Sequence, residues 1–140
     1  HLPIDGFYVF SKPEKKIIPT KSGPIQVVGI PWPNRHNLSL NQSQCLQSVP
    51  ELTKQISESL ASIIKNFAES LNASTPAILV GHLTVSSGIF SGSEKRAIYG
   101  QDPIVLPSQL AIQPFNYIAL GHLHRFQNLN EQGSIPIVYS

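Results

Sequence analysis

The chain of 140 residues lacks the features of several common protein classes. It has a single cysteine, Cys45, which excludes an internal disulfide and favours a reducing compartment, so we expect a cytoplasmic protein. It has no apolar run near the roughly 18 residues that a membrane span needs, and no signal peptide, so no membrane partner is expected. Charged residues make up only 13% of the chain, and its scattered lysines form no strong basic stripe.

Two catalytic motifs and one residue type are also missing. The sequence has neither the Gly-x-Ser-x-Gly turn of serine hydrolases nor the Gly-x-x-x-x-Gly-Lys loop that cradles nucleotide phosphates. Asp5 and Asp102 are its two aspartates. Methionine is absent and the chain begins with His1, so we expect it to be a piece of a longer protein.

The apolar patterning predicts an α/β fold in which one long helix flanks a mixed β-sheet. The helix is expected to begin at Ser48, where serine and Glu51 form a capping box, and to carry an apolar stripe from Leu52 to Leu71. The stretch 15–19 is expected to pair with a strand at 7–10. The residues expected to be strands are 7–10, 15–19, 25–30, 77–80, 104–106, 117–120 and 135–139, with a helical turn at 107–110.

Two of these strands run directly into glycine and histidine. The strand at 77–80 is followed by Gly81 and His82, and the strand at 117–120 is followed by Gly121, His122, Leu123 and His124. Neutral imidazole is the commonest metal ligand, and parallel strands deliver such residues to one edge of a sheet. The two junctions therefore predict a metal site, with surface histidines as the alternative interpretation.

The run from Tyr117 to Arg125 resembles the Gly-His-x-His metal motif of calcineurin-like metallophosphoesterases. Its flanks are similar to the SbcD branch, the nuclease subunit of the SbcCD double-strand-break repair complex. Further resemblance lies at 81–85, at 93–96 and in the closing stretch 137–140. It is strong over residues 77–140 and looser over 7–71, through a strand, the turn at 30–32 and the long helix.

This resemblance implies a partial αββα sandwich forming one domain over 1–140, and a two-metal phosphodiesterase that usually contains manganese. It implies that His82 and His122 ligate one divalent ion and that His124 ligates the other, the pair clamping the phosphate and activating water. The implied substrate is DNA in repair and recombination, with an SbcC-type ATPase subunit as partner. Arg125 is expected either to contact phosphate or to be a surface arginine.

The chain departs from the family's pattern, because the family's Asp-x-His, bridging aspartate and Gly-Asn-His-Asp are not in it. We therefore expect this piece alone to bind divalent metal weakly and to hydrolyse nothing. Two alternatives stay open: a phosphoesterase that acts on a small phosphodiester or nucleotide, and a non-catalytic α/β scaffold with a relic metal site. A partial sandwich would also leave part of its sheet uncovered, so self-association is expected.

Overall fold

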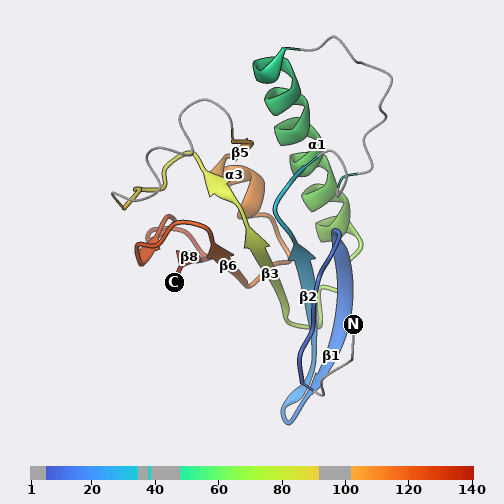
Figure 1. The fold of residues 1–140 in the computed structure, drawn as a ribbon. Helices are drawn as coiled ribbons and strands as arrows, with labels where there is room; N and C mark the ends of the chain where they lie inside the picture. The colour runs from blue at the N-terminus through green and yellow to red at the C-terminus, as the bar shows by residue number, and fades with distance from the viewer. Residues whose placement is uncertain (1–5, 35–37, 39–47, 92–101) are drawn as a thin grey trace.

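The computed structural model describes residues 6–34, 38, 48–91 and 102–140, which form a sheet with a long helix against one face (Figure 1). The strand order in the main sheet is β1-β2-β3-β6-β8-β7, and β4 and β5 form a separate two-stranded ladder. The strands are β1 (Glu14–Thr20), β2 (Gly23–Ile30), β3 (Ala77–His82), β4 (Thr84–Val85), β5 (Ile104–Val105), β6 (Tyr117–Gly121), β7 (Gln127–Asn128) and β8 (Ile137–Tyr139), and the helices are α1 (Val49–Glu69) and α3 (Pro107–Leu110). The expected α/β fold with a mixed sheet and a flanking helix is confirmed.

The first two strands form a hairpin that the sequence pattern did not predict. β1 pairs antiparallel with β2, from Glu14 opposite Gly29 to Thr20 opposite Gly23. The expected strand at 7–10 is wrong, because these residues have no ladder partner and lie outside the described strands. The side chain of Phe10 instead occupies the space where a Cβ on Gly29 would stand. The two-residue turn after Thr20 brings β1 onto β2 directly, with Gly23 at a φ of +115°.

Helix α1 connects the parallel strands β2 and β3, and its apolar stripe packs on the sheet. Ile56, Leu60 and Ile64 are buried, as the periodicity predicted. At its start, the Glu51 carboxylate accepts hydrogen bonds from the backbone N–H and the hydroxyl of Ser48, at 2.9 and 2.8 Å. These bonds lower the pKa of Glu51. The predicted helix start is therefore confirmed.

A buried glutamine ties the loop after α1 to the sheet. The side-chain amide of Gln26 donates to the carbonyls of Asn72 and Thr75 at 2.9 and 3.0 Å, and its oxygen accepts from the Asn72 N–H at 2.9 Å. The backbone N–H of Gln26 donates to the Pro76 carbonyl at 2.8 Å. These contacts hold the start of β3 in register with β2, and so determine where β3 ends.

Three parallel strands end together at the edge of the sheet where the histidines lie. In the ladders, Ile30 of β2 is opposite Gly81, and His82 of β3 is opposite Gly121 of β6. The expected strands at 77–80 and 117–120 are thus confirmed and extend by two residues and one residue. Because the register is shared, the residues that follow β2 and β6 arrive beside His82.

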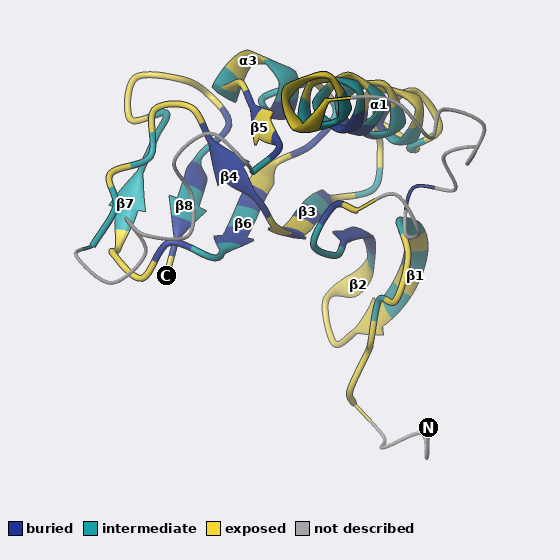
Figure 2. Cartoon of the chain, turned by 45° about the horizontal axis from the view of Figure 1, so that its top comes forward, coloured by how far each residue is buried: buried dark blue, intermediate teal, exposed yellow. Residues whose placement is uncertain are grey.

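The face of the sheet that points away from α1 is more open (Figure 2). On β3 and β6 the burial alternates, so that Leu79 and Ile118 are fully buried while Val80 and Tyr117 are 39% and 37% exposed. Apolar side chains on an open face are a potential contact surface. The expected self-association stays a prediction.

Several expectations concern residues that the structure does not describe, namely His1, Asp5, His36, Cys45 and the family-like loop at 93–96. Of the remaining elements, the helical turn at 107–110 is confirmed, and the last strand is shorter than expected, since Ile135 precedes β8. The short strands β4 and β7 were missed, because two residues carry no detectable period. Among the described helices, none combines the length and the apolar character needed to cross a membrane.

Candidate metal centre

The imidazole rings of His82 and His122 face each other at the sheet edge. His122 Nδ1 lies 3.3 Å from His82 Nε2, and the ring centroids are 5.1 Å apart. Either one ring donates a hydrogen bond to the other, or both nitrogens present lone pairs to the same point, depending on the tautomers. The predicted meeting of the two Gly-His junctions is therefore observed.

Trp32 packs against both imidazoles from the end of β2. Its ring centroid is 4.6 Å from that of His122 and 5.7 Å from that of His82. Burial, and then the proximity of His122 and His124, lower the pKa of His82 from its usual 6.5. A lowered pKa keeps this imidazole neutral at pH 7, which is the form that binds metal. The sequence pattern had marked Trp32 only as part of a strand-ending turn.

The backbone at His122 is unusual. Its φ is +106°, and it is the one non-glycine residue in the described part of the chain with a positive φ. Side chains larger than glycine rarely adopt such angles, and those that do cluster at functional sites. Gly121 has a matching role, since a Cβ there would stand 3.3 Å from His82 Nδ1. The glycine leaves room for an imidazole, where the sequence had suggested room for a metal or phosphate.

This backbone conformation predicts an unusual order of stability among variants. Both His122→Ala and His122→Gly remove the imidazole, but glycine adopts a positive φ without steric cost. We expect the glycine variant to be more stable than the alanine variant by about 1–2 kcal/mol, measured by urea denaturation. The same pair of substitutions at His124 is the control, where glycine should confer no advantage. Equal stabilities of the two His122 variants would contradict a strained backbone.

Asp102 reaches the other side of His122. Its carboxylate Oδ2 lies 3.6 Å from His122 Nε2, and the two side chains are only 14% and 17% exposed. This separation is ion-pair distance rather than a hydrogen bond, and His122 Nε2 is buried with no hydrogen-bond partner in the described residues. Sequence reasoning missed Asp102 as a neighbour of the site, because 20 positions separate the two residues and no local pattern links them.

His124 does not join the pair. It is exposed beyond the buried Leu123, yet close enough to His82 to lower the pKa of that imidazole. Within the described ranges, no three His, Cys, Asp or Glu side chains come together in a group able to hold a metal. The structure thus unites two of the three predicted ligands, and the role of His124 stays a prediction.

The segment after His82 is held from β8 by a buried tyrosine. The hydroxyl of Tyr139 donates to the Leu83 carbonyl at 2.6 Å and accepts from the Val85 N–H at 3.1 Å. Burial raises the pKa of Tyr139, so its hydroxyl stays protonated at any pH where the protein is studied. Tyr139 therefore anchors the chain directly beyond a candidate ligand.

A pocket of about 430 Å³ opens beside His82. It lies between the residues 8–10 and the strand ends, and it is lined by Ile30, Pro31, Val80, Gly81 and Gly121 together with the histidine. The wall is mostly apolar, so a polar ligand that enters would find its partner in the imidazole.

Comparison with known proteins gives a partial match. No protein-family model matches the chain. Over 68 residues, however, the chain is 40% identical to SbcD, the smaller-lettered half of the SbcCD nuclease, from Rhodobacter capsulatus. The aligned region covers 45% of this chain and 16% of that protein. The chain thus spans a small part of the relative it matches, and its similarity to a nuclease component extends over less than half of its own length.

Proposed function

We propose that this chain supplies part of a two-metal phosphodiesterase that cleaves DNA, and that His82 and His122 hold one of its divalent ions. The observation that carries the proposal is the 3.3 Å approach of His122 Nδ1 to His82 Nε2 at the ends of adjacent parallel strands. The similarity to a nuclease component supports DNA as the substrate. An SbcC-type ATPase partner and manganese belong to the same proposal.

The donor set fits an ion in part. Two ligand nitrogens at about 2.1 Å from one ion stand roughly 3.0–3.4 Å apart for octahedral to tetrahedral angles. The observed nitrogen separation falls in this range. Metal-binding histidines commonly direct their other ring N–H to a carboxylate, and Asp102 stands on that side of His122. The carboxylate that would bridge two ions is not among the described neighbours of the pair.

Each residue of the site has a separate task in this proposal. When bound, divalent ions polarise the phosphate and supply a nucleophilic water at neutral pH. His82 stays neutral because its pKa is lowered, and so is ready to ligate. Trp32 shields one side of the histidine pair. Asp102 orients His122 and so acts as a positioning residue.

The test uses Trp32, which is the single tryptophan of the chain. Because its ring lies 4.6 Å from that of His122, Co²⁺ or Mn²⁺ held by the pair should quench its fluorescence in a saturable manner. We expect His82→Ala and His122→Gly to abolish saturation, and His124→Ala to retain it. Quenching that does not saturate, or that survives both ligand substitutions, would overturn the proposed site.

The chain by itself is expected to be inactive. Two-metal hydrolysis needs ions held a few ångströms apart, and the described residues bring two imidazoles together but no bridging carboxylate. We therefore expect no Mn²⁺-dependent hydrolysis of single-stranded DNA or of bis-p-nitrophenyl phosphate by the purified chain. Hydrolysis that EDTA abolishes and that His82→Ala removes would contradict this expectation.

One observation favours the non-catalytic alternative, in which the histidines are a relic. His82 and His122 can satisfy each other through a single hydrogen bond, without any ion. In that case Co²⁺ would leave Trp32 fluorescence unchanged, so the same titration separates the two functions.

A further inference from the structure

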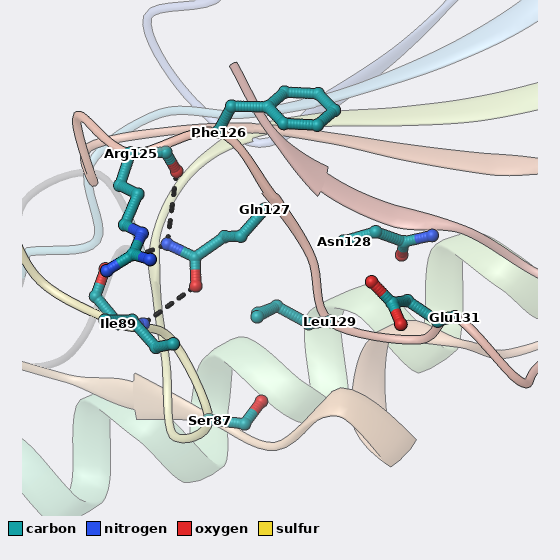
Figure 3. Close-up of a pocket in the computed structure, with 8 residues that line it drawn as sticks. All are labelled: Ser87, Ile89, Arg125, Phe126, Gln127, Asn128, Leu129 and Glu131. Carbon is teal, nitrogen blue, oxygen red and sulfur yellow. Dashed lines mark hydrogen bonds between the residues drawn. The ribbon is translucent and has the colours of Figure 1, made fainter.

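A second pocket, of about 570 Å³, begins one residue beyond His124 (Figure 3). It is lined by Ser87, Ile89, Arg125, Phe126, Gln127, Asn128, Leu129 and Glu131. We propose that this pocket binds an unpaired nucleotide of a DNA strand, with Phe126 stacking on the base and Arg125 pairing with a phosphate. The proposal rests on the proposed function, because it assigns the DNA strand a place next to the histidines.

The pocket has a rigid floor. The side-chain amide of Gln127 forms a two-way link with Ile89, accepting from its N–H at 2.8 Å and donating to its carbonyl at 2.9 Å. The same amide donates to the Arg125 carbonyl at 3.2 Å. Gln127 therefore joins the loop after β4 to the segment after β6. Because these bonds fix the backbone on both sides, the neighbouring side chains project from a fixed frame.

Phe126 is available for stacking. Its side chain is 77% exposed, and burying so large an apolar surface stabilises a complex. Exposed aromatic rings in nucleic-acid-binding proteins stack on unpaired bases, and each such contact tolerates any base because every base has a π-face. This property favours an unpaired strand over a duplex, whose bases are already stacked.

The charges of the pocket orient the strand. The Arg125 guanidinium has no ion pair or hydrogen bond with another described residue, so it remains able to bind an anion. Glu131 lies at the opposite end of the pocket, where its carboxylate would repel phosphate (Figure 3). Arg125 follows His124 directly, so the phosphate is expected at the end nearer the histidines. A planar guanidinium binds phosphate oxygens in pairs.

The experiment measures binding of a fluorescein-labelled single-stranded oligonucleotide by anisotropy, in EDTA. Without metal, failure of this pocket and failure of the proposed metal site are separate results. We expect Phe126→Ala to weaken binding about tenfold, and Phe126→Tyr to restore it. Phe7→Ala is the matched control, since Phe7 is 74% exposed and lies outside the pocket.

Arg125→Ala is expected to weaken binding and to lower the slope of log affinity against log salt by roughly one. Lys54→Ala removes the same charge from the exposed face of α1 and should do neither. No measurable binding of the strand would overturn the proposal. So would equal losses in the pocket and control variants, or tighter binding of blunt duplex than of the single strand.

Discussion

Replacement of Tyr139 by phenylalanine should destabilise the protein by about 3 kcal/mol, because each buried backbone group that loses its partner costs about 1–3 kcal/mol. The hydroxyl is the shared partner of the Leu83 carbonyl and the Val85 N–H, and Tyr139 is fully buried. Phenylalanine has the same shape but satisfies neither group. The loss would be a large fraction of the roughly 5–15 kcal/mol that stabilises a typical domain.

The measurement is urea denaturation followed by circular dichroism, with a lower midpoint and an unchanged slope expected. Tyr117→Phe is the matched control, because Tyr117 lies on the open face of the sheet and is 37% exposed. Its loss should stay within about 0.5 kcal/mol. If both variants lose the same stability, the hydrogen bonds of Tyr139 are not what holds the segment after His82.

The second large effect is expected at Asp102. Substitution of a carboxylate that orients a metal-binding histidine typically costs 10–100-fold in affinity, and we expect a loss in this range for Asp102→Asn. The asparagine keeps the size of the side chain but not the charge that faces His122 Nε2 at 3.6 Å. Titration of Trp32 fluorescence with Co²⁺ measures the affinity.

Two controls separate positioning from bulk charge and from folding. Glu58→Gln removes one negative charge from the exposed face of α1 and should leave the Co²⁺ affinity unchanged. A double-mutant cycle with His122→Gly tests whether Asp102 acts through the imidazole. Asp102→Asn should then have no further effect in the His122→Gly background. A full additional loss in that background would show that Asp102 acts independently of His122.

Much of the fold was predictable from local sequence patterns, since those patterns reflect burial within single elements. The stripe of α1 repeats with the period of a helix, and Ser48 with Glu51 marks its first turn. The strands before His82 and His122 are short apolar runs that end at glycine. Parallel pairing then places their ends at one edge, so the meeting of the two imidazoles also followed from the sequence.

Only the tertiary structure decided which distant residues join these elements. The segment at 7–10 has an apolar pattern, but β2 pairs with β1 instead, because the turn after Thr20 brings those strands together at once. Trp32 and Asp102 reach the histidines across long sequence separations, and His124 stays apart because the chain turns at His122. A periodic pattern records the side of an element that is buried, whereas these contacts depend on which elements pack together. The sequence alone therefore determined the elements and the histidine pair, and tertiary packing decided what surrounds that pair.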